Sequence, residues 1–214
     1  MPEPISIHDA KHQRSLYEPL TQSVRHLIDV AIRSEADGEA VRQAHRLIDE
    51  AVELLSTRLH QGSYGLRHVV DGTPLVWGNV AMGLRNAIAP PLEVHKRPDG
   101  RVCADLFLGA PYEGPAGHVH GGMCALVLDH VLSATAHRDQ SPAVTGTLII
   151  RYVRPTTLGQ LRAEAWTDRD EGSKTFAVGQ ITDSDGNVTV RAEGVFIRPN
   201  TSGDRGSHGV ERRD

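Results

Sequence analysis

The feature that most constrains this chain is an apolar stretch with helical spacing, Cys124–Ala136, which follows closely on Gly121 and Gly122. Apolar residues predominate on every side of it, and its one acidic residue is Asp129. A helix of this kind cannot stand alone in water, so other elements must surround it. An unpaired carboxylate is costly to desolvate in such a place. We therefore expect a buried central helix whose acid has a partner or a chemical task.

The segments on either side of this helix have the two-residue alternation of β-strands. One lies at Arg101–Leu108, after a hairpin turn at 98–100, and a turn is also predicted at Asp168–Gly172. The strands expected after the helix are Val144–Arg154, Gln160–Thr167, Lys174–Thr182 and Val188–Arg198. The predicted order is two strands, one helix and four strands. This order favours an α+β fold in which a curved antiparallel sheet wraps around the central helix.

The N-terminal part of the chain has a different pattern. Apolar residues fall at helical spacing through Leu16–Leu59, with a break at Asp37-Gly38, so two amphipathic helices are predicted, and Asp37 is a suitable N-cap for the second. The Gly- and Pro-rich segment at 60–91 is predicted to be an irregular connector, with a short extended piece near Leu75–Trp77. Amphipathic helices usually bury one face, so we expect these two to cover the sheet rather than to dock a partner.

These patterns divide the chain into three parts. They are a helical extension with its connector at 1–88, the main domain at 89–198, and a polar tail at 199–214 that is predicted to be disordered.

Composition excludes several classes of function. The 23 basic and 27 acidic residues give a net charge of −4 without a long run of one sign, so neither a nucleic-acid partner nor a membrane partner is expected. Cys103 and Cys124 lack metal-ligand spacing and are predicted to be reduced core thiols. The N-terminus has no signal-peptide pattern, and no apolar window reaches transmembrane length. We therefore expect the protein in the cytoplasm.

Three elements in order carry a resemblance to a known family. They are His-Gly-Gly at 120–122, an acid nine positions after the histidine, and a Thr-x-x-Leu-x-x-x-Tyr-x-Arg-Pro strand from Thr145 to Pro155. Over about residues 89–198 the chain resembles the hotdog-fold acyl-CoA thioesterases, both the phenylacetate-pathway type and the thioesterase superfamily members. The resemblance implies a hotdog fold, an acyl-CoA substrate, and hydrolysis without a metal or an organic cofactor.

The resemblance also implies roles for two residues. Asp129 would activate water or attack the thioester itself, and the backbone N–H of Gly121 would bind the carbonyl oxygen, which suits the free amides and positive dipole of a helix N-terminus. The two residues are eight positions apart, or about 12 Å along one helix, so one helix cannot supply both to one thioester. We therefore expect a homodimer with two shared sites. Such dimers, and often dimers of dimers, are usual in this family.

Further residues are assigned around this pair. By resemblance Thr145 lies near the acid, although threonine is also simply common in strands. Ser133, one turn after Asp129, would contact the carboxylate or the attacking water, or it is a small polar residue without a role. His120 would orient the turn or contact the thioester.

Gly122 and His118 are assigned to substrate binding. Many relatives have Asn or Gln before the His-Gly-Gly turn, where this chain has Tyr112-Glu113-Gly114-Pro115, so the second oxyanion contact stays open.

Other chemistries fit the sequence less well. His118, His120, Asp129 and His130 would form a poor metal set, because the first two flank a turn, while Asp129 lies about two turns into the helix and His130 points roughly 100° away from it. Phosphate-binding glycine loops and a Gly-x-Ser-x-Gly element are missing. The alternatives are a hotdog dehydratase or hydratase, in which His120 would be the essential acid/base, and a non-catalytic acyl-CoA-binding protein.

Overall fold

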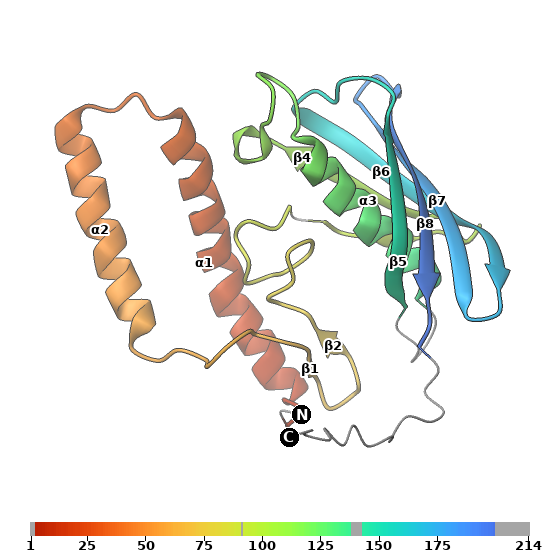
Figure 1. Ribbon diagram of the computed structural model, residues 1–214. Helices are drawn as coiled ribbons and strands as arrows, with labels where there is room; N and C mark the ends of the chain where they lie inside the picture. The colour runs from red at the N-terminus through yellow and green to blue at the C-terminus, as the bar shows by residue number, and fades with distance from the viewer. Residues whose placement is uncertain (1–2, 91, 138–142, 200–214) are drawn as a thin grey trace, which may run out of the picture. The chain divides into compact units, whose positions relative to one another are not determined.

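The computed structural model describes residues 3–90, 92–137 and 143–199 (Figure 1). These residues form two compact units. The helical unit contains the described parts of Met1–Glu93, Leu106–His120 and Thr157–Gln160, and the sheet unit contains those of Val94–Asp105, Gly121–Thr156 and Leu161–Asp214. Each unit is described by itself. The predicted tail at 199–214 lies outside the described residues, apart from Pro199.

A six-stranded antiparallel sheet is the main feature of the sheet unit, with strand order β3-β4-β6-β7-β8-β5. Its strands are β3 (His95–Lys96), β4 (Val102–Leu108), β5 (Val144–Tyr152), β6 (Gly159–Glu171), β7 (Lys174–Thr182) and β8 (Val188–Ile197). The predicted strand order along the chain is confirmed. Strand β5 lies at the edge of the sheet, where β8 is its single strand neighbour among the described residues.

The central helix α3 (Gly121–Ala136) packs against β5, β7 and β8. Its side toward the sheet includes Leu132, which is fully buried. Glycines lie below it: a Cβ atom added at Gly179 would stand 2.6 Å from Leu132 Cδ1, and one at Gly194 would stand 3.1 Å from Leu132 Cδ2. The helix can lie this close to the sheet because both side chains are absent. The predicted α+β hotdog fold is confirmed.

One predicted turn is wrong. Strand β6 continues through Asp168–Glu171 and pairs with β7 as far as the register Glu171↔Lys174, so that the turn lies at Gly172 and Ser173. Gly172 has a φ of +58°, which glycine adopts without steric cost. The misread residues are charged and exposed, so they lack the apolar alternation by which a strand is predicted.

The helical unit begins with α1 (Ile7–Arg33) and α2 (Gly38–Ser56). As predicted, Asp37 caps α2, since its side chain accepts hydrogen bonds from the amides of Glu39 and Ala40. Helix α1 starts earlier than its apolar spacing suggested, because Ser6 caps it and the first turns are polar.

The connector contains two short strands, β1 (Arg67–His68) and β2 (Pro74–Leu75), which form a separate two-stranded sheet. A small core of Ala10, Val69, Leu75 and Trp77 holds this part of the unit together. A short 3-10 helix, η1 (Ala110–Tyr112), contacts α1.

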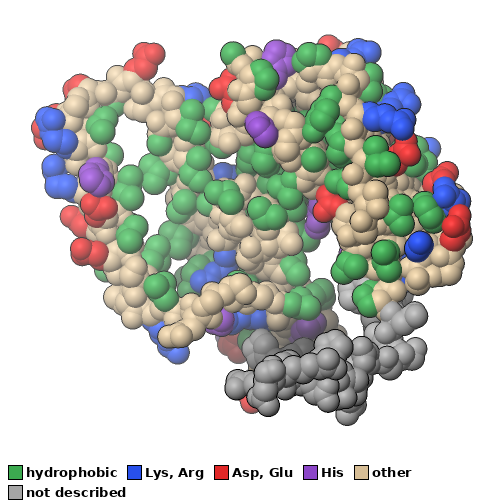
Figure 2. All heavy atoms as spheres, in the orientation of Figure 1, with side chains coloured by type: hydrophobic (Ala, Val, Ile, Leu, Met, Phe, Trp, Pro, Cys, Tyr) green, Lys and Arg blue, Asp and Glu red, His purple; other side chains and the backbone are tan. Residues whose placement is uncertain are grey.

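Helix α2 is the more exposed of the two N-terminal helices within the helical unit. None of its residues is buried. Figure 2 shows hydrophobic side chains along α2 on the side toward α1, while charged side chains cover its other side. Its apolar face is therefore exposed within the described part of the helical unit. Among the described residues, no helix combines the length and the apolar character needed to span a membrane.

Candidate active site

The sheet unit brings Asp129 and Thr145 into direct contact. The Thr145 hydroxyl on β5 donates a hydrogen bond of 2.8 Å to Oδ1 of Asp129, on the third turn of α3. Asp129 is half-buried rather than desolvated as we expected. The physical reason is that its partner strand is the edge of the sheet, so no further strand among the described residues covers the carboxylate from that side.

A β-bulge at Gly146 gives Thr145 this orientation. Tyr152 and Thr145 both contact α3 from β5, although they are seven residues apart and strict alternation would turn them to opposite faces. The register with β8 shifts between Thr145 and Thr147, which leaves Gly146 as the additional residue. Bulges of this kind redirect a side chain near a functional site. Gly146 is therefore part of the candidate site, and the alternation pattern of β5 alone did not reveal it.

Tyr152 fixes the start of α3. Its hydroxyl donates a hydrogen bond of 2.9 Å to the carbonyl oxygen of Gly121. A Cβ atom added at Gly121 would lie 3.0 to 3.2 Å from the tyrosine hydroxyl and ring, which is tighter than ordinary packing. Gly121 therefore lets the ring approach the first turn. Sequence reasoning gave Tyr152 no role, although this residue is the tyrosine of the strand that carries the family resemblance.

Gly121 and Gly122 are the first two residues of α3. Amides in the first turn of a helix have no acceptor within the helix, and they stand at the positive end of its dipole. Such groups can stabilise a negative oxygen. Asp129 is eight residues further along the same helix, about 12 Å by helical rise. The first-turn amides and the carboxylate of one α3 are therefore too far apart to act on one carbonyl group.

Ser133 does not contact the acid as we expected. Its hydroxyl donates to the carbonyl oxygen of His130, at 2.9 Å, which is the local bond that serine commonly makes in a helix. His130 itself is half-buried, and burial lowers its pKa, while the charge of Asp129 opposes part of this shift. The neutral imidazole is therefore favoured next to the acid.

His118 and His120 belong to the helical unit, where they form part of a tight turn. The carbonyl oxygen of His118 accepts a 2.9 Å bond from the Gly114 amide, and the amide of His120 donates a 2.9 Å bond to Tyr112. His118 Nδ1 lies 2.8 Å from the carbonyl oxygen of Ala116, and the His120 side chain is exposed. Within the described parts of the chain, no group of three His, Cys, Asp or Glu side chains could hold a metal ion.

The two cysteines are free and buried, as predicted. Burial raises the pKa of the Cys124 thiol, and its Sγ lies 3.9 Å from the hydroxyl of Thr156. Protonated core thiols of this kind are poor nucleophiles. Cys124 lies on α3, but it is a packing residue there.

The fold places this chain among hotdog proteins, and comparisons with known proteins specify the family. The model of the thioesterase superfamily matches residues 116–190. A crystal structure of a protein described as belonging to this superfamily is 32% identical, covers 85% of this chain and 94% of its own, and superposes with a TM-score of 0.72. The chain belongs to the thioesterase superfamily.

Two further relatives cover different parts of the chain. The acyl-coenzyme A thioesterase THEM4 of Xenopus laevis is 33% identical over 100 residues, which make up 45% of this chain and 44% of that protein. The match thus spans less than half of this curated relative. A Bacillus halodurans protein crystallised with CoA is 22% identical, covers 78% of this chain and 98% of its own, and has a TM-score of 0.50, which shows a shared fold.

Proposed function

We propose that this protein is a thioester hydrolase that cleaves acyl-CoA to the free acid and CoA. The observation that carries the proposal is the contact of Thr145 with Asp129 on a central helix that begins with two glycines. Membership of the thioesterase superfamily supports it, as does a relative named as an acyl-CoA thioesterase. The CoA in the Bacillus halodurans structure supports the choice of thiol.

Asp129 is the reactive group in this proposal. Thr145 occupies Oδ1, which leaves Oδ2 to act. As a base, the carboxylate takes a proton from water, the hydroxide adds to the thioester carbonyl, and the proton passes to the departing CoA sulfur. As a nucleophile, it forms an acyl anhydride and expels CoA thiolate, and water then hydrolyses the anhydride. Both routes need the carboxylate ionised and oriented, and both end in the same products.

The oxyanion donor in this proposal is the Gly121 amide of a second subunit, because the helical rise separates the two features of one α3. The edge strand β5 supports a homodimer. Its outer backbone has no strand partner among the described residues, the apolar side chains of Val144 and Ile149 on it are exposed, and Val153 is exposed just after its end. Unpaired strand edges with apolar side chains favour association with another chain. Such a dimer would hold two equivalent sites, and two dimers could associate further.

The remaining site residues have supporting roles. His120 orients the turn before α3 or contacts the thioester, and His118 and Gly122 contribute to substrate binding. Ser133 keeps hydroxyl lone pairs free of its bond to His130, so it can accept a hydrogen bond from the attacking water.

Release of free thiol from a panel of acyl-CoAs, phenylacetyl through palmitoyl, tests this function. We expect Asp129→Asn to lower turnover by about 10²- to 10⁴-fold, the usual contribution of an acid/base group. His120→Ala should reduce turnover less. Circular dichroism and molar mass verify that each variant stays folded and associated.

Failure of the wild-type protein to cleave any acyl-CoA would overturn the proposal, as would full activity of Asp129→Asn. If His120→Ala alone abolished activity, and the protein hydrated an enoyl-CoA, the dehydratase alternative would take its place.

A further inference from the structure

Helix α2 has the residue spacing of a helix that pairs with another helix. Along one line of it, apolar residues alternate at intervals of three and four: Val41, Ala44, Ile48, Ala51 and Leu55. This is the heptad seam of a coiled coil. Leu47 and Leu54 widen the stripe and are 58% and 73% exposed. At about 100° per residue these residues cover an arc roughly 140° wide, which is broader than one neighbouring helix can cover.

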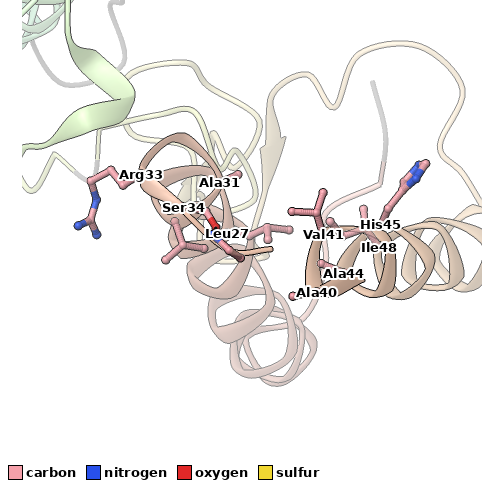
Figure 3. A pocket seen from close by; sticks show the side chains of 11 residues that line it. Leu27, Ala31, Arg33, Ser34, Ala40, Val41, Ala44, His45 and Ile48 are labelled. Atoms are coloured by element: carbon pink, nitrogen blue, oxygen red, sulfur yellow. Dashed lines mark hydrogen bonds between the residues drawn. The ribbon is translucent and has the colours of Figure 1, made fainter. Parts of the chain in front are cut away.

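Helix α1 covers this stripe only in part. The two helices leave a groove of about 500 Å³ between them, whose apolar walls are formed by Leu27, Val30 and Ala31 of α1 and by Val41, Ala44 and Ile48 of α2. Figure 3 shows Leu27 and Val41 extending into the space between the two helices. The groove is open, and even the α2 residues that line it are exposed.

Side-chain size indicates in which direction a second helix would run if it packed on the apolar stripe of α2. Val41, Ile48 and Leu55 are bulky, while Ala44 and Ala51, between them on the seam, are small. In a parallel pair each residue meets its own copy, so bulky residues would face each other and the alanines would leave gaps. In an antiparallel pair the bulky positions of one helix lie over the alanines of the other, which fills space evenly. A second copy of α2 is thus complementary when it runs antiparallel.

The charges of α2 give an independent indication of the same direction. The first half carries Arg42, His45 and Arg46 beside Glu39, and the second half carries Asp49, Glu50 and Glu53. A parallel copy would place the carboxylates beside each other, whereas an antiparallel copy brings basic and acidic halves together. The acids also lie toward the negative end of the helix dipole of α2, and an antiparallel neighbour supplies the opposite end. Among the described residues, Glu50 and Glu53 form no ion pair.

We propose that α2 pairs antiparallel with α2 of a second copy of this chain, so that the two α1–α2 hairpins form a four-helix bundle. The same surface serves both copies, as twofold symmetry requires. The paired helix occupies the groove beside α1 and covers the stripe that α1 leaves exposed. This interface is separate from the β5 edge and does not depend on the proposed activity.

Molar mass in solution tests the pairing with the full chain. Ile48→Glu places a charge in the centre of the seam and should halve the mass of the assembly, while Gln43→Glu adds the same residue beside the seam and should leave the mass unchanged. Thiol release per subunit is measured in parallel and should not change in either variant. If Ile48→Glu has the same mass as the wild-type protein, the pairing is refuted whether or not the protein cleaves acyl-CoA.

Spin labels test the direction of pairing. Glu39→Cys and Arg46→Cys, labelled separately, lie seven residues apart on the same face of α2. In an antiparallel pair the offset between identical labels along the helix axis is larger at position 39 than at position 46 by about 20 Å, whereas a parallel pair gives equal distances. The difference should disappear when Ile48→Glu is added. Equal distances in the seam-intact protein would overturn the proposal.

Discussion

Asp129 is oriented by one hydroxyl group. The carboxylate lies at an open edge and is half-buried, so side-chain rotation is not blocked by packing alone. The 2.8 Å bond from Thr145 selects one arrangement of the two carboxylate oxygens. Charge-assisted hydrogen bonds are strong enough to decide between rotamers of this kind.

Replacement of Thr145 by valine should therefore lower activity without harming the fold. Valine keeps the shape of threonine but cannot donate, and a hydrogen bond to a charged group is worth about 1.5–3 kcal/mol, so kcat/KM should fall by about 10- to 100-fold. Thr147→Val, two residues along the same exposed strand, is the matched control. Equal kinetics of the two variants would show that the Thr145 bond does not matter for turnover.

His130 should make stability depend on pH. Burial lowers its pKa in the folded protein, so the unfolded chain binds the proton more readily. The contribution to the free energy of unfolding is present above about pH 6.5, the ordinary value for histidine, and is lost as the pH falls through the lower, folded value.

We expect His130→Gln to flatten the loss of stability between pH 7 and pH 5, compared with the wild-type protein. Urea unfolding at several pH values measures this difference, with His12→Gln, an exposed histidine of α1, as the control. Parallel stability curves for the wild-type protein and His130→Gln would contradict the assignment.

At the scale of elements, β5 positions the site. It supplies Thr145 to the acid and Tyr152 to the first turn of α3, and these two contacts fix the helix near both of its functional features. The bulge at Gly146 makes the two contacts compatible, because it compensates for the odd separation of seven positions between Thr145 and Tyr152.

Deletion of Gly146 should turn Thr145 to the opposite face of the sheet while the contact of Tyr152 remains. Activity should then fall at least as far as in Thr145→Val, since the same bond is lost. Gly146→Ala keeps the bulge, and its Cβ atom would lie 2.8 Å from the flexible end of Ile197 and 3.3 Å from the carbonyl oxygen of Val195, so small shifts should accommodate it and most activity should remain. If the deletion variant is folded and fully active, the bulge has no role in the site.

Most of the helices and strands of the sheet unit could be predicted from the sequence. The alternation predicted β7 with its observed bounds, and the all-round apolar pattern predicted α3. The bulge could not be predicted, because it depends on how β5 pairs with β8 and not on β5 itself.

The contacts of the site residues also could not be predicted from the spacing of residues within one element. The family resemblance placed Thr145 near the acid, and the structure shows the contact. Spacing alone put Ser133 one turn from Asp129, but the serine hydroxyl bonds a carbonyl of its own helix instead. Likewise, the periodicity of α2 revealed an apolar face, but periodicity does not say what covers such a face.

At the scale of the whole molecule, the proposed site is divided between two subunits. A variant that lacks the acid and a variant that lacks the oxyanion amide should then restore activity when mixed. Asp129→Asn removes the acid, and Gly121→Pro removes the amide at a helix position where proline is tolerated.

After co-refolding equal amounts of these two variants, about a quarter of the wild-type activity should return, since half of the dimers are mixed and each has one intact site. Gly121→Ala has the same close contact with Tyr152 but keeps its amide, so it shows how much of the loss is steric. No recovery in the mixture, with mixed dimers present, would mean that each subunit carries a complete site.

The close packing of α3 on the sheet affects the position of Asp129, although the glycines that allow this packing lie away from the acid. The helix packs over Gly179 and Gly194, which present no side chains toward it. A methyl group at Gly179 would stand 2.6 Å from Leu132 and act as a spacer that lifts the helix from the strands, and one at Gly194 would meet the Phe196 ring as well as Leu132. Asp129 would then move away from Thr145 although neither residue had changed. The hydrogen bond between the Thr145 hydroxyl and the Asp129 carboxylate thus depends on how closely the opposite side of α3 packs on the sheet.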